Sequence, residues 1–352
     1  IMAYTTIDDP SAHFQTALYT GNGSSQSITN DGNSDLQPDW IWGTLRDEDG
    51  GARWIFDSTR GTTKRLKTDA NTEEQVRSGV TAFNSDGFTV GSHSDSNLNN
   101  KSLVAWQWKA NGGTTSSNSN GTNITSTVQA NTTAGFSIVT FTGTGNDGDS
   151  YGHGLTSAPE LVIPKRRDST SNWQGYAFDG GNSQYWYLNL ENAFASTSGN
   201  SAASSSSVIT TDASGDSNPN GGTVVSYCFH SVKGYSKIGR YSGTGNADGA
   251  FVYTGFKPTW VLIKVTNSAN HWAILDSSRT DSSGGNSIDR WIRANNTTVE
   301  VDGQGIDFDF VSNGFKLRSA DNITNNSGKD YFYMAFAEHP FVSSEGVPVT
   351  AR

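Results

Sequence analysis

Residues 251–264 read Phe-Val-Tyr-Thr-Gly-Phe-Lys-Pro-Thr-Trp-Val-Leu-Ile-Lys, and this stretch decides the fold class. It is made of short β-branched and aromatic runs, separated by glycine and polar turn residues as elsewhere in the chain. Runs of ~4–8 such residues without a long 3.6-residue period predict strands. Pro258 stands at the start of a run, where its missing N–H removes no ladder hydrogen bond. The chain is therefore predicted to be all-β.

The same order of landmarks occurs three times along the chain. Each copy has a glycine-rich turn, a proline that opens a strand, a tryptophan that opens or precedes the next strand, and a closing aromatic strand. The prolines are Pro38, Pro159 and Pro258, and the tryptophans are Trp54, Trp173 and Trp272. Their recurrence favours a core position over a sugar-stacking one.

The repeats predict tandem antiparallel β-sandwiches of the jelly-roll or lectin-like kind. We place them at residues 1–110, 128–232 and 233–352, with a polar linker at 111–127. A polar, low-complexity stretch at 196–220 is predicted to be a surface loop. The pattern leaves one alternative open, in which pairs of copies merge into larger jelly rolls.

Composition excludes several classes of protein. With 24 basic and 34 acidic residues, the net charge of −10 disfavours nucleic-acid binding. No apolar run reaches the ~20 residues of a membrane-spanning helix, so membrane insertion is not expected. The first residues show no signal peptide, which predicts synthesis in a cytoplasm. The single cysteine, Cys228, lies in an apolar run and is predicted to be a buried, inert thiol.

Three adjacent aromatic residues, Tyr185, Trp186 and Tyr187, occur in the middle copy only. On a strand, the two tyrosines share one face and the tryptophan takes the other. This run is the candidate glycan-binding platform, and a strand buried on both faces is the competing interpretation.

Two alternating acidic runs are the candidates for catalysis. Glu300 and Asp302 share one face of a strand, as do Asp307 and Asp309, and glycosidases need two carboxyl groups. The other interpretation is a solvent-exposed face opposite a Val or Phe core face. We expect no cofactor, although calcium on loop oxygens, with Asp147 and Asp149 as ligands, stays open. The histidines lack the spacing of a zinc site.

Three blocks resemble a known family. These are residues 2–8 (Met-Ala-Tyr-Thr-Thr-Ile-Asp), 245–258 and 333–341 (Tyr-Met-Ala-Phe-Ala-Glu-His-Pro-Phe), and the likeness extends to the final residues 346–352. They resemble a tandem-repeat family of unknown function found in marine bacteriophages, regarded as virion or tail-associated proteins with lectin-like sandwiches. The resemblance implies a virion protein and carries no catalytic residues.

The expected function is therefore a virion protein, in a tail fibre or capsid decoration, that acts outside the cell and adheres to host-surface or environmental glycans. A depolymerase, either a hydrolase or a lyase acting on host or algal polysaccharide, is the alternative. The third possibility is a purely architectural protein. The expected partners are polysaccharides and other virion proteins, and homo-oligomers stay open.

Overall fold

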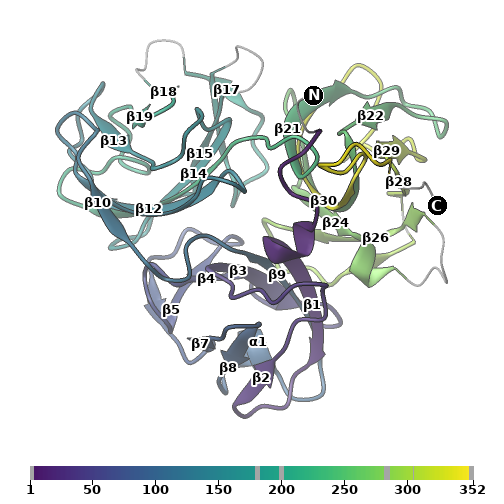
Figure 1. Cartoon of the computed structure of the whole chain (residues 1–352), viewed down its shortest axis with the longest axis horizontal. Helices are drawn as coiled ribbons and strands as arrows, with labels where there is room; N and C mark the ends of the chain where they lie inside the picture. Colours follow the sequence, from purple (N-terminus) through teal and green to yellow (C-terminus); the bar gives the residue numbers. More distant parts are fainter. Residues whose placement is uncertain (1–3, 179–182, 198–201, 281–285, 304, 349–352) are drawn as a thin grey trace.

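The computed structural model describes residues 4–178, 183–197, 202–280, 286–303 and 305–348. Strands account for 43% of the chain and helices for 3%, which confirms the all-β fold class. The described residues form six sheets, two in each third of the chain, and the three sheet pairs surround a common centre (Figure 1). Residues 2, 3 and 349–352, which carry part of the family resemblance, lie outside the described residues.

The first sheet pair, which we call the first sandwich, has a large and a small sheet. The large sheet has the order β1 (Phe14–Thr20), β9 (Ser102–Trp108), β3 (Trp40–Leu45), β4 (Trp54–Asp57), β5 (Lys64–Lys67) and β6 (Gln75–Val76). The small sheet has the order β2 (Gln26–Ile28), β8 (Phe88–Val90) and β7 (Val80–Phe83). A 3-10 turn, η1 (Pro10–Ala12), precedes β1, and a short helix, α1 (Ser94–Asn97), precedes β9.

The second sandwich repeats this topology with two added strands. Its large sheet has the order β10 (Ser116–Asn118), β11 (Ser126–Asn131), β12 (Phe136–Thr142), β20 (Thr223–Phe229), β14 (Leu161–Arg166), β15 (Gln174–Ala177), β16 (Gln184–Tyr187) and β17 (Ala195–Ser196). Its small sheet has the order β13 (Ser150–Gly152), β19 (Val208–Thr210) and β18 (Ala203–Ser204).

The third sandwich follows the same order. Its large sheet contains β21 (Ser236–Ser242), β30 (Asp330–Pro340), β23 (Phe256–Val265), β24 (Ala273–Asp276), β26 (Arg290–Arg293) and β27 (Val301–Asp302). Its small sheet contains β22 (Phe251–Tyr253), β29 (Gly314–Leu317), β28 (Phe308–Val311) and β25 (Ser287–Ile288). A 3-10 turn, η2 (Ser277–Arg279), follows β24.

Two segments differ from the sequence interpretation. The predicted linker 111–127 contains β10, which pairs with β11 and extends the second large sheet, so it is not a free linker. The predicted loop 196–220 contains β18 and β19 and buries polar side chains. Asn218 donates to the Asn146 carbonyl at 3.0 Å, and Asp212 accepts from the Tyr176 hydroxyl at 2.8 Å. These hydrogen bonds satisfy buried polar groups, which composition alone does not show.

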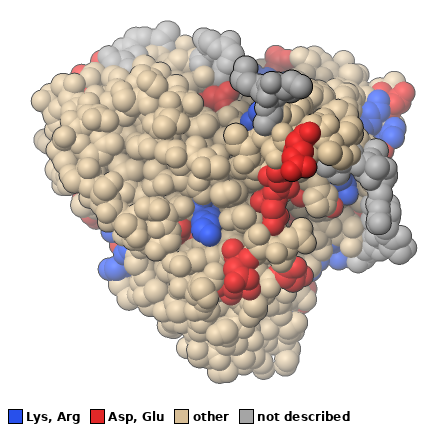
Figure 2. Space-filling model, in the orientation of Figure 1, with Lys and Arg blue, Asp and Glu red and all other residues tan. Residues whose placement is uncertain are grey.

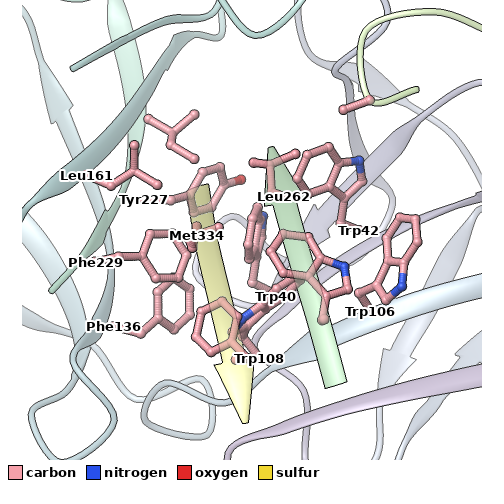
Figure 3. Close-up of a cluster of buried hydrophobic side chains, with 14 of the residues drawn as sticks. Trp40, Trp42, Trp106, Trp108, Phe136, Leu161, Tyr227, Phe229, Leu262 and Met334 are labelled. Carbon is pink, nitrogen blue, oxygen red and sulfur yellow. The ribbon is translucent and has the colours of Figure 1, made fainter. Parts of the chain in front are cut away.

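The central strands of each large sheet, such as β3 and β9, are buried on both faces. One face packs on the small sheet of its own sandwich, and the other packs in a central core shared by all three sandwiches. Figure 3 shows Trp40, Trp106, Tyr227 and Met334 converging there from different sandwiches. Burial on both faces explains why strands such as β3 read as continuous apolar runs instead of alternating.

The pairing register shows which residues of the three copies correspond. Asp57 lies opposite Trp40, Asp276 lies opposite Trp260, and Ala177 lies opposite Leu161. Counting back from these three residues, Trp272 and Trp173 align with Arg53, which is also buried. All three repeated tryptophans are buried, but Trp54 is therefore not at the equivalent position.

Three seams join the sandwiches cyclically: first to second, second to third, and third to first. In each seam the donor is the backbone N–H of the residue directly before β6, β17 or β27. The acceptor is the carbonyl of the residue that directly follows β14, β23 or β3, respectively, in the next sandwich. These bonds are Glu74 to Arg167 at 2.9 Å, Phe194 to Thr266 at 2.8 Å, and Glu300 to Arg46 at 3.0 Å.

A second, side-chain contact also recurs in every seam. The donor is the residue at the Arg53, Trp173 or Trp272 position, and the acceptor is a carbonyl of the neighbouring sandwich. These bonds are Trp173 to Lys67 at 2.7 Å, Trp272 to Tyr187 at 3.1 Å, and Arg53 to Arg293 at 2.7 Å. Because equivalent positions meet in all three seams, the chain is a closed ring with approximate threefold symmetry, built within one polypeptide.

Candidate functional site

The tryptophan of the predicted aromatic platform is buried, and its two tyrosines are partly buried. Trp186 is only 1% exposed, and its ring centroid lies 4.7 Å from that of Trp272 in the central core. Tyr185 and Tyr187 are half-buried on the other face of β16, with ring centroids 5.9 Å apart. Trp186 is therefore not available to stack on a sugar, because its face of the sheet packs in the central core.

Glu300 is held in the third–first seam. It accepts from Arg279 at 2.6 Å and from Arg46 of the first sandwich at 2.8 Å. Burial alone would raise the pKa of this carboxyl, but the two guanidinium groups outweigh burial and lower it. A general acid needs a raised pKa, so Glu300 is placed as an ion-pair partner and not as an acid.

The other acidic candidates also have cationic or hydroxyl partners. Asp302, whose side chain is 61% exposed, contacts Arg290 at 3.0 Å, and the same arginine lies 3.8 Å from Glu300. Asp307 and Asp309 lie in or next to the small sheet, where they contact Ser287 at 3.0 Å and Arg318 at 2.5 Å, respectively. The two acidic pairs thus belong to different sheets.

The predicted calcium loop is tied together by its own side chains. Asp149 accepts hydrogen bonds from Thr144 at 2.6 Å, Asn123 at 2.7 Å and Asn146 at 3.1 Å. Asp147 is exposed. Among the described residues no group of three or more His, Cys, Asp or Glu side chains could hold a metal ion. Cys228 is buried as predicted, and burial raises the pKa of its thiol to about 12.

The solvent-exposed aromatic residues lie elsewhere. All 10 tryptophans are buried, whereas Phe251 and Tyr253 are 47% and 56% exposed. They lie on β22 at the edge of the third small sheet, and Val252 between them points into the core. Alternation along the strand places both rings on the outer face. We call them the aromatic pair.

The aromatic pair is specific to the third sandwich. The corresponding strands β2 and β13 place Ile28 and Tyr151 inward, where β22 places Val252. The residues before these inward positions are Ser27 and Ser150, and those after them are Thr29 and Gly152. Two of three copies therefore keep this face small or polar, so the fold does not require aromatic residues there.

A polar hollow adjoins the aromatic pair through Tyr4. The Tyr4 hydroxyl donates to the Gly255 carbonyl at 2.9 Å and lies 3.3 Å from the Tyr253 hydroxyl. Lys233 Nζ lies 4.2 Å from the Tyr4 ring centroid. The hollow measures about 500 Å³, and we call it the Tyr4 hollow. It is lined by Tyr4, Thr5, Thr6, Thr132, Thr133, His230, Ser231, Val232 and Lys233.

The lining of the Tyr4 hollow offers many hydrogen-bonding groups. Hydroxyl groups come from the N-terminal segment, the β11–β12 turn and the link between the second and third sandwiches. His230 Nδ1 lies 3.0 Å from the Ser231 carbonyl, and its buried Nε2 has no hydrogen-bond partner among the described residues. Burial, reinforced by Tyr253, raises the pKa of Tyr4, so its hydroxyl stays protonated at neutral pH.

Charge is unevenly distributed over the face of the molecule that Figure 2 shows. In Figure 2 most of the visible surface of the second sandwich is uncharged, and acidic groups gather along the junction of the first and third sandwiches.

The sequence contained one signal for this site. The run Phe251-Val-Tyr253 alternates, and its counterparts in the other copies have serine, threonine or glycine outside. The approach of Tyr4 to Tyr253 joins residues 249 positions apart, and no local pattern predicts such a contact.

Comparisons with known proteins give a family and no activity. A family model described as "Domain of unknown function (DUF7483)" matches residues 9–340. No curated protein matches the chain, and no solved structure does. Among the described residues no helix has the length and apolar character needed to cross a membrane.

Proposed function

The chain belongs to this DUF7483 family, whose function is unknown, and from that premise we propose that it is a non-catalytic carbohydrate-binding protein. The observation that carries the proposal is the exposed pair Phe251 and Tyr253, which has no aromatic counterpart at the outward positions of β2 and β13. An exposed aromatic ring loses little by covering the C–H face of a sugar, and it gains buried apolar area.

The Tyr4 hollow supplies the polar half of such a site. Saccharides have an apolar ring face and a rim of hydroxyl groups, and they need donors and acceptors beside an aromatic surface. Tyr253 provides the surface, and Thr5, Thr132 and Ser231 line the neighbouring hollow. A volume of about 500 Å³ lies within the ~300–1,000 Å³ of small-molecule sites.

We place this activity in a bacteriophage virion, in a tail fibre or a capsid decoration. The support is the resemblance of residues 245–258 and 333–341 to marine phage proteins. Attachment to a host-surface or environmental polysaccharide suits a weak site, because a polymer and a particle each present many copies and so raise the overall affinity. Calcium is not part of this proposal.

The test is retention on immobilised neutral polysaccharides. In Phe251→Ser/Tyr253→Thr, the third sandwich takes the residues of the first, Ser27 and Thr29. We expect at least a tenfold loss of retention, equivalent to about 1.4 kcal/mol, with an unchanged melting temperature. Val76→Ala, which removes another exposed apolar side chain (64% exposed), is the matched control. Equal retention by wild type and the double variant would refute the proposal.

A second candidate function is purely architectural, and the closed ring of three seams favours it. A protein of this kind would present its three sandwiches to neighbouring virion proteins and would bind no glycan. Size-exclusion chromatography of protein and polysaccharide mixtures separates the three possibilities. Co-elution of the protein with intact polymer supports adhesion, and shortened polymer supports a depolymerase. If the polymer neither co-elutes with the protein nor is shortened, the architectural role is supported.

A further inference from the structure

The second–third seam lacks an ion pair that the other two seams have. In the first–second seam Arg167 contacts Glu74 at 2.9 Å, and in the third–first seam Arg46 contacts Glu300 at 2.8 Å. The corresponding residues of the second–third seam are Thr266 and Phe194. Their backbone bond, at 2.8 Å, is the same as in the other seams, so the positions are equivalent and only the side chains differ.

The missing arginine leaves space. Beside Thr266 and Phe194 lies a hollow of about 520 Å³, which we call the seam hollow. Its walls also include Gln184, Arg240, Ser242 and Asp330. Threonine is several atoms shorter than arginine, and Phe194 turns its ring toward the core, where it lies 5.9 Å from the Trp272 ring. Neither side chain therefore fills the place that the ion pair takes in the other seams.

The seam hollow contains an unsatisfied acceptor. Gln184 Oε1 is buried and has no hydrogen-bond partner among the described residues. A buried carbonyl without a donor costs free energy, and a ligand hydroxyl would remove that cost once the Gln184 amide turns toward the hollow. Nearby, Ser242 donates to Asp330 at 2.8 Å, and the Arg240 guanidinium carbon lies 5.7 Å from the Phe194 ring centroid.

These groups define the class of ligand. Gln184 and Asp330 call for a ligand with hydroxyl donors, and the amide nitrogen of Gln184 calls for a hydroxyl oxygen that accepts from it. A neutral saccharide has all of these features. The volume, about 520 Å³, lies within the ~300–1,000 Å³ of small-molecule sites.

We propose that the seam hollow is a second saccharide-binding subsite, separate from the aromatic pair and the Tyr4 hollow. The class of ligand rests on the proposed function, but the subsite does not depend on Phe251 or Tyr253. Two subsites on one chain would let a single polysaccharide or two neighbouring chains be held at both places, which raises the overall affinity.

The test rebuilds the missing ion pair. Phe194→Glu/Thr266→Arg gives the second–third seam the residues of its neighbours and fills the seam hollow. Binding of laminarihexaose, cellohexaose and mannohexaose is measured by ligand-observed NMR and by calorimetry. We expect that at least one of these sugars binds wild type at two sites and the double variant at one, with a folded spectrum preserved.

Gln184→Leu is the second variant, and it avoids any charge change. It removes the unsatisfied acceptor, so we expect no loss of thermal stability and at least about a fivefold weaker binding at the seam site. Phe251→Ser/Tyr253→Thr is the matched control, because it should remove the other site and leave this one.

The outcomes separate the two proposals. If both seam variants bind all three sugars as wild type does, the seam subsite is refuted, and the proposed function is judged by the aromatic-pair variant alone. If the aromatic-pair variant loses no binding while the seam variants do, the subsite stands and the aromatic pair is refuted as a site. If wild type binds none of the sugars, both are refuted.

Discussion

Glu300 is the residue whose role the structure changes most. It was a candidate catalytic acid, and it lies in the third–first seam between Arg46 and Arg279. Removing one member of a buried ionic cluster leaves the other charges uncompensated, and this is costly in a low-dielectric environment. The same reasoning predicts a small effect for an exposed carboxylate such as Asp302, which pairs with Arg290.

We therefore expect Glu300→Gln to lower the free energy of unfolding by about 3 kcal/mol. Asp302→Asn, at a side chain that is 61% exposed and pairs with Arg290, should change it by less than about 0.5 kcal/mol. Urea unfolding of both variants measures this. A catalytic role would instead predict a stable Glu300→Gln protein that has lost polysaccharide cleavage.

Two lysines make the stability depend on pH. Lys165 Nζ donates to the Ser171 carbonyl at 2.5 Å, and Lys264 Nζ donates to the Glu191 carbonyl across the second–third seam at 3.2 Å. Burial lowers the pKa of both ammonium groups to about 8. An unfolded lysine keeps its proton to higher pH, so between about pH 8 and pH 10 the unfolded chain binds more protons than the folded chain.

The contribution of Lys165 and Lys264 to the free energy of unfolding should therefore rise from about pH 8 to pH 10. Above that range the buried tyrosines, whose pKa is raised, reverse the slope as unfolded tyrosines ionise. Urea unfolding of wild type and Lys165→Met at pH 7.5 and 9.5 measures the contribution. We expect a smaller increase in the variant, and identical slopes would contradict the assignment.

At the scale of the strand pair, glycine and tryptophan oppose each other twice. Gly43 of β3 lies opposite Trp54 of β4, and Gly175 of β15 lies opposite Trp186 of β16. A Cβ atom on either glycine would overlap the indole ring that lies across it. The absence of a side chain on one strand is what lets the large ring lie flat on its partner.

Gly43→Ala and Gly175→Ala should each lower the free energy of unfolding by about 1–3 kcal/mol, because the ring must move. Gly215→Ala is the control, since nothing lies within 4 Å of its added Cβ. Thermal unfolding of the three variants checks this. If Gly215→Ala lowered the free energy of unfolding as much as the other two variants do, the cause would be the backbone freedom of glycine and not ring overlap.

The elements were predicted better than their contacts. Runs such as residues 259–264 identify strands because β-branched and aromatic residues cluster between turns, and their threefold order gives the repeats. Sequence spacing nevertheless aligned Trp54 with Trp272, whereas pairing aligns Arg53 with it. Register depends on the partner strand, and a one-residue offset is invisible in a list of landmarks.

The candidate site was predicted less well for the same reason. Tyr185, Trp186 and Tyr187 form a conspicuous local cluster, but the covering of Trp186 comes from Trp272 of another sandwich. No local sequence pattern indicates that a residue is buried by a segment distant in the sequence. The exposed pair of Phe251 and Tyr253 was readable in principle, because the outward residues of its two counterparts are not aromatic.

At the scale of the whole molecule, the sandwiches share one core. Trp40, Tyr227 and Met334 come from three different sandwiches and lie in a single buried cluster. Separating any sandwich would expose this apolar face to water, which is unfavourable in proportion to its area. The seams therefore couple the three sandwiches thermodynamically.

We expect the chain to unfold in a single transition. In scanning calorimetry the ratio of calorimetric to van't Hoff enthalpy should be close to one, although the chain is long enough for several domains. Two or three resolved transitions would show that each sandwich is stable without the central core. The Glu300→Gln variant should shift the whole transition and not a part of it.

Joining the three lobes covalently also changes what a single mutation does. In a ring of three identical subunits, a codon change that removed a bridging arginine would remove it from every interface at once. Here Thr266 differs from Arg46 and Arg167 while the other two interfaces keep their ion pairs. One interface can thus give up this ion pair and become free to acquire a separate role, while the other two interfaces keep theirs.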